Sequence, residues 1–198
     1  RNRLASAGIP VVEAWDLSDT ALDIQVGFSH EKVGALVADH FFAKGYRRFS
    51  VISVDDPRAI RRCDGLIERL KQHDLHDVAV EILPLPATWE VGREGLKRLQ
   101  RRASPPELIF CSSDTLAFGV LAEAASQGLR VPQDIAVLVF GDITNAKFAH
   151  PALSTVSVNA ATMGREVAEA LLRRFSGQGD SSVSQMDTGF ELIERAST

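Results

Sequence analysis

The residues best suited to chemistry follow a short apolar run. Leu108–Cys111 is apolar throughout, and Ser112, Ser113 and Asp114 come directly after it. The next apolar residues recur at helical spacing, so the pattern predicts a buried strand, a tight turn and a helix. In an open parallel sheet, ligands bind at the carboxyl ends of the strands, where Ser113 and Asp114 would stand. The residue types support equally well the alternative that one of these side chains only caps the helix.

A second group is the arginine cluster Arg58, Arg61 and Arg62, which follows the predicted strand 49–54. Arg58 and Arg62 share one helix face, where like charges repel unless an anion lies between them. A guanidinium offers a planar fork that suits a carboxylate or a pair of sugar hydroxyls. On the arginines alone, a solvated basic face is the favoured interpretation. Trp89, at the start of a predicted helix, either packs in the core or provides a flat surface for a sugar ring. Core packing is the favoured interpretation.

The sequence lacks the motifs of common catalytic and cofactor sites. It has no glycine-rich phosphate loop ending in Gly-Lys-Ser/Thr, no Gly-x-Gly-x-x-Gly after the first strand and no Gly-x-Ser-x-Gly elbow. Histidines and aspartates gather in residues 73–77, but polar residues are expected at a helix end, and the spacing does not match a zinc ligand set. We therefore expect no metal, no cofactor and no catalysis. An enzyme acting on a carbohydrate would need an acid–base pair, for which Asp16 and Asp142 are the only plausible candidates.

Composition narrows the possible partners. The 198 residues carry a net charge of -4 and no Lys/Arg-rich run, so we do not expect the chain to bind DNA by itself. No apolar run approaches the roughly 20 residues of a membrane span, and no signal peptide opens the chain. Cys63 and Cys111 fit free thiols in a reducing, cytoplasmic compartment better than a disulfide framework. The chain opens at Arg1 rather than Met, which suggests a fragment of something longer.

Strands and helices alternate almost without exception. The predicted strands are 9–12, 24–28, 49–54, 79–83, 108–111, 135–140, 154–158 and 190–195; the predicted helices are 31–44, 58–73, 89–102, 115–127 and 162–175, with a turn at 177–182. This alternation predicts an α/β fold with a parallel sheet and helices on both of its faces.

Seven short segments occur in a set order along nearly the whole chain: Gly45–Phe49, Arg62–Gly65, Ser113–Gly119, Gly128–Val137, Phe140–Asp142, Pro151–Val156 and Leu192–Thr198. Each is weak alone, but in this order and spacing the chain resembles the effector-binding core of the LacI/GalR family of bacterial transcription regulators. Residues 9–17 and 26–32 also resemble the gluconate-operon repressors of that family. The resemblance implies a periplasmic-binding-protein-like type I fold, in which two Rossmann-like lobes with parallel sheets hold the ligand in the cleft between them.

The resemblance also implies how the chain divides. An incomplete amino-terminal lobe would hold residues 1–28 and 159–182, and a carboxyl-terminal lobe would hold residues 29–158 and 183–198. The family's helix-turn-helix DNA-binding domain is expected to be absent from this sequence, so that DNA would be bound only through that domain of a full-length protein. Homodimer contacts would involve the helix around 117–126 and the loop around 144–152.

The resemblance further carries over ligand contacts, position by position. Asp16 matches an aspartate that hydrogen-bonds sugar hydroxyls, Arg62 an arginine aimed into the cleft, and Trp89 an aromatic stacking position. Ser113 replaces the asparagine that usually precedes Asp114. Gly141 stands where sugar-binding members place an aspartate, so only the following acid remains, and Ser29-His30 stands where many members carry Asp-Asn. The predicted ligand-binding residues are Asp16, Ser29, Arg62, Trp89, Ser113 and Asp142.

These departures favour a charged effector. Two anionic groups that would face a neutral sugar are gone while Arg62 stays, and an unpaired carboxylate beside a buried one is costly. We therefore predict a small sugar or sugar acid, gluconate-like, that shifts the population of lobe arrangements and thereby the DNA affinity of the full-length protein. A periplasmic sugar-binding receptor of the same fold is the alternative. Segments 62–65 and 194–198 favour the regulator, which would dimerise, whereas a receptor would be monomeric.

Overall fold

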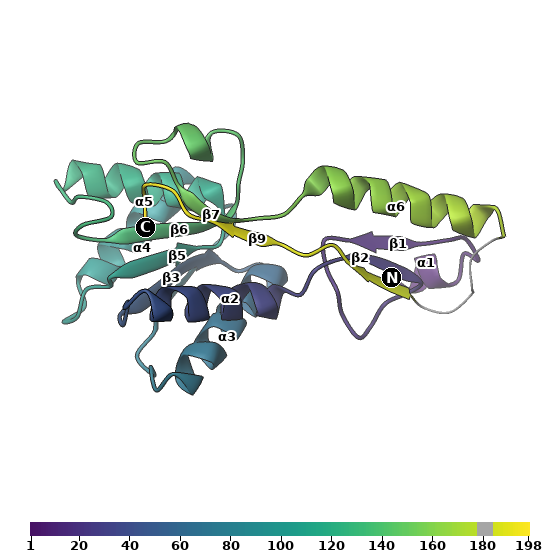
Figure 1. The fold of residues 1–198 in the computed structure, drawn as a ribbon, viewed down its shortest axis with the longest axis horizontal. Coiled ribbons are helices and arrows are strands. Elements are labelled where there is room, and N and C mark those ends of the chain that lie inside the picture. The colour runs from purple at the N-terminus through teal and green to yellow at the C-terminus, as the bar shows by residue number, and fades with distance from the viewer. Residues whose placement is uncertain (178–183) are drawn as a thin grey trace. The chain divides into compact units, whose positions relative to one another are not determined.

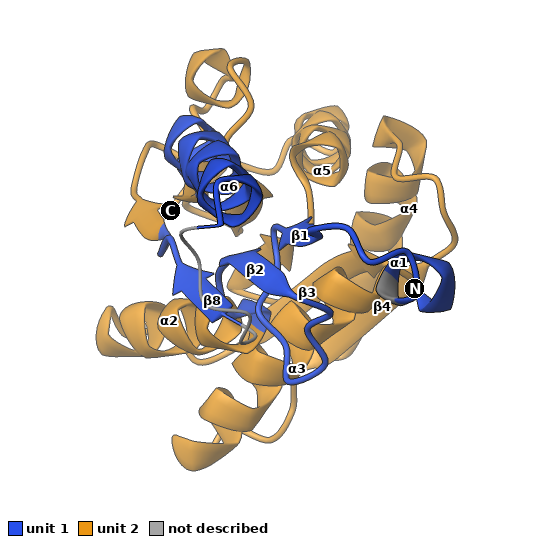
Figure 2. Cartoon of the chain, turned by 90° about the vertical axis from the view of Figure 1, so that its right-hand side faces the viewer, with its two compact units in different colours: residues 1–30, 158–190 blue, residues 31–157, 191–198 orange. Residues whose placement is uncertain are grey.

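The computed structural model describes residues 1–177 and 184–198, which form two compact units. Unit 1 comprises Arg1–His30 and Val158–Phe190, and unit 2 comprises Glu31–Ser157 and Glu191–Thr198 (Figure 2). The chain therefore leaves unit 1, builds most of unit 2, returns to unit 1 and ends in unit 2. Within the described residues, every helix is too short or too polar to cross a lipid bilayer.

Unit 1 is built on a three-stranded parallel sheet in the order β1-β2-β8. Its strands and helices are α1 (Asn2–Ala5), β1 (Val12–Ala14), β2 (Ile24–Gly27), α6 (Ala160–Phe175) and β8 (Ser184–Asp187). Helix α6 packs on β1 and β2 (Figure 1). Its amino end is capped by Asn159, whose side chain accepts a hydrogen bond from the Thr162 N–H.

Unit 2 contains a six-stranded sheet in the order β4-β3-β5-β6-β7-β9, parallel except for β9. Its strands are β3 (Phe49–Val54), β4 (Ala79–Leu83), β5 (Leu108–Cys111), β6 (Ala136–Gly141), β7 (Ser154–Ser157) and β9 (Glu191–Ile193). Its helices are α2 (His30–Ala43), α3 (Pro57–Gln72), α4 (Trp89–Gln100), α5 (Asp114–Ser126) and the 3-10 helix η1 (Ala146–Phe148). Helices α2 and α3 cover one face of this sheet, and α4 and α5 cover the other (Figure 1).

Glycines let the helices of each pair come into backbone contact. On the α4–α5 side, a Cβ on Gly119 would stand 2.1 Å from the Trp89 carbonyl oxygen. On the α2–α3 side, a Cβ on Gly34 would stand 2.1 Å from the Arg62 carbonyl oxygen. Because no side chain fits at these points, the glycines fix the separation of each helix pair, and Gly34 fixes the position of the turn that carries Arg62.

The segment after β9 is bound into the same sheet. Ser197 donates its hydroxyl to the Val137 carbonyl oxygen at 2.6 Å and accepts a hydrogen bond from the Ser154 N–H at 2.8 Å. The Val137 N–H in turn donates to the Ser197 carbonyl oxygen. These bonds satisfy buried polar groups at the β6–β7 junction, so the last residues of the chain belong to the core of unit 2.

The α/β fold with predominantly parallel sheets is confirmed, but two boundaries differ from the sequence prediction. The first strand is 12–14 rather than 9–12, because Pro10 leaves the preceding residues outside the β1–β2 ladder. Strand β8 was not predicted, and it places residues 184–190 with unit 1 rather than with the second lobe. Its main chain pairs with β2, whereas its side chains are mostly exposed and polar. Of the predicted turn at 177–182, residues 178–182 lie outside the described residues.

Candidate functional site

Arg62 lies on α3 with its guanidinium beside the carboxyl end of β5. The Arg62 Cζ atom is 3.9 Å from the centroid of the Phe140 ring, and Nη2 donates to the Ser112 carbonyl oxygen at 3.3 Å. Asp56 caps α3 by accepting hydrogen bonds from two main-chain N–H groups of its first turn, which orients this end of the helix. Arg62 is only 5% exposed, and burial lowers its pKa to about 10, so the side chain remains a cation at neutral pH.

Two serines at the same strand end carry hydroxyls that lack partners. The Oγ atoms of Ser112 and Ser113 are buried, and neither has a hydrogen-bond partner among the described residues. Ser113 is the residue that precedes α5, but its side chain makes no capping hydrogen bond, so capping is not what this hydroxyl does here. Buried hydroxyls are normally satisfied, so an unsatisfied hydroxyl at the carboxyl end of a strand indicates a place where another molecule completes the bonding.

The two acids of this edge are engaged by the protein itself. The Asp114 carboxylate accepts a hydrogen bond from the Asp142 N–H at 3.3 Å, and burial raises the pKa of Asp114 against the lowering effect of the N–H groups of Ile143 and Asp142. The Asp142 carboxylate pairs with Arg195 Nη2 at 2.8 Å, while Arg195 Nη1 donates to the Leu153 carbonyl oxygen. Asp114 thus holds the loop after β6, and the charge of Asp142 is neutralised.

Asp16 and Ser29 lie in unit 1, each after a strand. Asp16 follows β1 and Ser29 follows β2, so both stand at the carboxyl edge of that parallel sheet. Gly27 lets the Asp16 main chain approach β2, because a Cβ on Gly27 would be 2.4 Å from the Asp16 N atom. His30 Nε2 lies 3.1 Å from the Trp15 carbonyl oxygen and 3.9 Å from Asp16 Oδ1, which ties the loop after β1 to the start of α2.

Trp89 is the first residue of α4 and lies at the surface of unit 2. Its indole is 55% exposed and stacks on Phe118, with ring centroids 5.5 Å apart and an interplanar angle of 22°. Together with Leu83, Val91 and Ala122, it lines a groove of about 820 Å³ formed by the end of β4, α4 and α5. The Trp89 side chain is therefore not core packing, and its role as a stacking wall for a ligand stays a prediction.

The histidines and aspartates of residues 73–77, for which the sequence predicts no metal site, include His73, which contacts α2. His73 stacks on the Phe42 ring, and its Nε2 atom lies 2.7 Å from Asp39 Oδ1. Among the residues that the structure describes, no three His, Cys, Asp or Glu side chains are arranged to hold a metal ion. Cys63 and Cys111 are free and buried, and burial raises the pKa of the Cys63 thiol to about 11.

Three of the predicted residues, Arg62, Ser113 and Asp142, thus lie at the carboxyl edge of the unit 2 sheet, where Arg62 contacts Ser112 and Asp142 contacts Asp114. Ser112 belongs to the same cluster and was not among them. The only signal for Ser112 in the sequence was a hydroxyl directly after the apolar run, whereas Ser113 was chosen from its strand-end position and from the family pattern. Asp16 and Ser29 meet at the corresponding edge in unit 1.

Residues 38–198 match the family model of the periplasmic binding protein-like domain. The chain belongs to this family. The periplasmic binding protein-like domain is 36% identical over its whole length to the HTH-type transcriptional regulator GntR of Pseudomonas aeruginosa, of which it covers 58%. It is 30% identical, over 81% of the chain, to the HTH-type transcriptional repressor CytR of Escherichia coli, of which it covers 47%. The domain therefore spans about half the length of these curated relatives.

Solved structures of transcription regulators have the same fold as this chain. The transcription regulator GntR from Chromobacterium violaceum superposes on this periplasmic binding protein-like domain with a TM-score of 0.89 at 32% identity, covering 99% of the chain and 72% of that structure. A LacI family transcriptional regulator from Silicibacter pomeroyi gives a TM-score of 0.87 at 28% identity, with the same coverage. The resemblance to LacI-type regulators stated from the sequence motifs is thereby confirmed.

Proposed function

We propose that the chain is the effector-binding domain of a bacterial LacI-type transcriptional regulator and that its effector is a gluconate-like sugar acid. The single observation that carries this proposal is the buried cation of Arg62 at the carboxyl edge of the unit 2 sheet, in contact with Ser112, whose hydroxyl has no partner among the described residues. A guanidinium in such a place binds a carboxylate through parallel, charge-assisted hydrogen bonds.

The charges around Arg62 support an acid rather than a neutral sugar. Asp142 is paired with Arg195, Asp114 is occupied by main-chain N–H groups, and Gly141 contributes no acid. A carboxylate ligand therefore meets little repulsion beside Arg62. Ser113 supplies a hydroxyl for the polyol part of the effector. We extend the proposal to Asp16, Ser29 and Asp142 as further ligands for effector hydroxyls.

The proposed activity is binding without chemical conversion of the effector. An effector that binds one conformation of the regulator more tightly than another shifts the population toward it, and coupling free energies of about 1–3 kcal/mol are typical of such switches. DNA would be bound through a helix-turn-helix domain of the full-length regulator, and the buried free thiols suit a cytoplasmic location.

Calorimetric titration of the chain with gluconate and with glucose tests the effector. We expect gluconate to bind at least about tenfold more tightly than glucose, because a charge-assisted hydrogen bond is worth about 1.5–3 kcal/mol. Arg62→Met should abolish measurable gluconate binding. The matched control is Arg58→Met, one helical turn earlier, where the side chain is 51% exposed. Tighter binding of glucose would overturn the acid preference.

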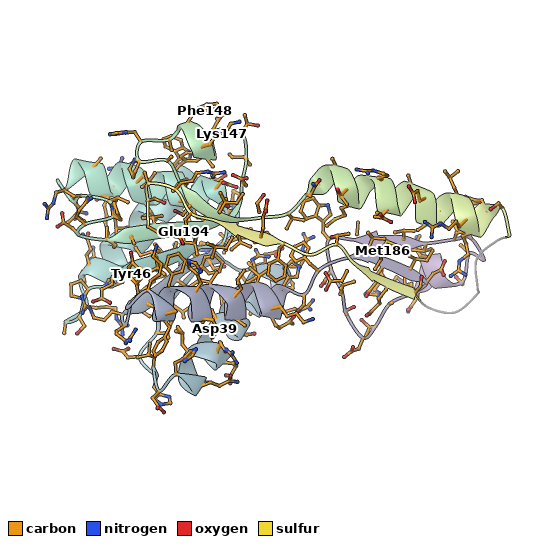
Figure 3. The ribbon with its side chains drawn as sticks, in the orientation of Figure 1. Asp39, Tyr46, Lys147, Phe148, Met186 and Glu194 are labelled. Atoms are coloured by element: carbon orange, nitrogen blue, oxygen red, sulfur yellow. The ribbon has the colours of Figure 1, made fainter. Side chains whose placement is uncertain are left out.

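We also propose that the regulator is a homodimer and that the α4–α5 surface, formed by Trp89, Phe118 and Ala122, contributes to its interface. Helix α5 is otherwise largely buried, so these are the apolar side chains through which this surface could contact a partner. The loop residue Phe148 is 74% exposed and was expected to take part; Figure 3 shows Lys147 and Phe148 at the tip of that loop. Exposed aromatic side chains of this kind are enriched at interfaces.

Sedimentation velocity tests the dimer. We expect Trp89→Ala to weaken self-association while gluconate binding persists; the matched control Leu172→Ser, at an exposed apolar position of α6, should leave the dimer intact. Loss of gluconate binding in a Trp89→Ala protein that remains dimeric would instead support the predicted stacking role. A monomeric unsubstituted chain would favour the solute receptor.

A further inference from the structure

We infer that Ser112 is a specificity-determining residue, which donates its hydroxyl to the effector carboxylate that Arg62 binds. This inference rests on the proposed function and deepens it, because it names a second group that would hydrogen-bond to the carboxylate of the effector. Neither the family pattern nor the sequence analysis assigned a role to Ser112.

The strand geometry puts the Ser112 side chain on the Arg62 side of the sheet. The Ser112 N–H donates to the Ile52 carbonyl oxygen at 3.0 Å, so the β3–β5 ladder continues through this residue. Ile109 and Cys111 belong to the apolar core cluster that includes residues of α4 and α5. Because side chains alternate along a strand, Ser112 lies on the opposite face, which is the face that α3 covers.

The main chain of Ser112 already positions the cation. Arg62 Nη2 donates to the Ser112 carbonyl oxygen, and Arg62 Cζ lies over the Phe140 ring, 3.9 Å from its centroid. The guanidinium is therefore held beside Ser112 before any effector arrives. The Ser112 hydroxyl is left with its donor unused, since Ser112 is only 6% exposed and its Oγ has no partner among the described residues.

A carboxylate is the group that this pair of donors recognises. A carboxylate oxygen only accepts hydrogen bonds, whereas a guanidinium only donates them, and a hydroxyl beside it can donate as well. A hydrogen bond to an ionised acceptor is roughly twice as strong as one between neutral groups. Removing the hydroxyl should therefore cost an acid more affinity than it costs the corresponding neutral amide.

A packing imperfection would also leave a buried hydroxyl unsatisfied, and Thr155 provides the matched control. Its Oγ1 is likewise buried without a partner among the described residues, but it lies within β7 rather than at the carboxyl edge. Replacing either hydroxyl by an apolar group removes an unsatisfied polar atom, so neither Ser112→Ala nor Thr155→Val should lower the free energy of unfolding. Only Ser112→Ala should change effector binding.

The test is calorimetric titration of the whole chain and its variants with gluconate and with gluconamide, which carries the same hydroxyls but no charge. For Ser112→Ala we expect gluconate affinity to fall about tenfold to a hundredfold, with a smaller loss for gluconamide. Thr155→Val should bind both ligands as the unsubstituted chain does. Ser113→Ala should lower the affinity for gluconate and for gluconamide to a similar degree, because the Ser113 hydroxyl is assigned to the polyol part that both ligands share.

The outcomes separate the inference from the proposed function. If the unsubstituted chain binds gluconate and Ser112→Ala binds it equally well, the role of Ser112 is overturned and the proposed function stands. Equal losses for gluconate and gluconamide in Ser112→Ala would likewise overturn carboxylate recognition by this hydroxyl. If the unsubstituted chain binds neither ligand, the proposed effector is wrong and the inference fails with it. A lower unfolding free energy for Ser112→Ala would show a structural role and contradict the inference.

Discussion

The carboxylate of Asp114 lies where a side chain on residue 141 would begin. A Cβ on Gly141 would stand 1.9 Å from Asp114 Oδ2, and Gly141 also adopts a φ of +153°. Asp114 therefore excludes the acid that the family resemblance places at this position. The absence of that acid is a packing requirement of unit 2 as well as a matter of effector charge.

The first prediction follows from this contact. Gly141→Ala and Gly141→Asp should each lower the free energy of unfolding by at least about 2 kcal/mol, because the Asp114 carboxylate is buried and cannot move aside without losing its main-chain donors. Urea denaturation measures the loss. An alanine variant as stable as the unsubstituted protein would show that Asp114 yields easily.

The second prediction concerns pH. Burial raises the pKa of Asp114 above its ordinary value of 3.8, so the folded state holds the proton more tightly than the unfolded state. The contribution of this group to stability is greatest below pH 3.8, falls as the pH rises through the raised pKa, and is constant above it. Asp114→Asn keeps one acceptor oxygen but cannot titrate. Its stability relative to the unsubstituted protein should therefore improve as the pH rises from about 4 to 7, as urea unfolding at several pH values would show. A difference independent of pH would contradict the assignment.

The third prediction tests the Arg195–Asp142 pair, whose side chains are 17% and 19% exposed. Arg195→Gln should lower the unfolding free energy by about 2 kcal/mol, because it leaves a half-buried carboxylate without its cation. The matched control, Arg173→Gln, breaks the exposed Arg173–Glu169 pair and should cost less than about 0.5 kcal/mol.

Gluconate binding adds a second measurement to this prediction. Arg195→Gln should also lower the affinity for gluconate. Without Arg195, the negative charge of Asp142 is uncompensated at the sheet edge that holds Arg62, and it repels the gluconate carboxylate. Unchanged gluconate affinity in a folded Arg195→Gln protein would show that Asp142 does not influence the effector.

The fourth prediction compares two helical glycines. Gly119→Ala should destabilise unit 2 by about 2 kcal/mol or more, since its Cβ would overlap the Trp89 carbonyl oxygen and push α4 and α5 apart. Gly164→Ala, within α6, meets nothing within 4 Å and should stabilise the protein by about 0.5–1 kcal/mol through helix propensity. Thermal or urea unfolding of the two variants is expected to give opposite signs; equal effects would refute the close-packing explanation for Gly119.

The pattern of apolar residues predicted those strands whose side chains are buried. The central strands β3 and β5 of unit 2 are buried on both faces, and their near-continuous apolar runs mark them clearly. Strand β8 escaped prediction because Ser184–Asp187 is held by main-chain pairing with β2 and presents little apolar surface. Such a strand has no signature in hydrophobic periodicity.

The candidate site was predictable only in part, for a related reason. The strand-end position of Ser113 and the family pattern for Arg62 pointed to the carboxyl edge. The pairing of Asp142 with Arg195 and the unsatisfied hydroxyl of Ser112 depend on contacts between residues far apart in the chain, which one sequence does not reveal. Trp89 was interpreted as either core packing or a ligand wall; its exposure and its stacking on Phe118 exclude core packing, and the ligand wall stays a prediction.

Strand β8 is synthesised long after its sheet neighbour β2, which affects how the two units can fold during translation. Strands β3 to β7 come from one uninterrupted stretch, so most of the unit 2 sheet can assemble once residue 157 has emerged. Strand β2 pairs with β1 but must wait for its second partner, β8, about 160 residues downstream, so a nascent chain exposes that edge of β2 until residues 184–187 have been synthesised. Of the two units, unit 1 is therefore the one that slow synthesis would leave longer open to aggregation.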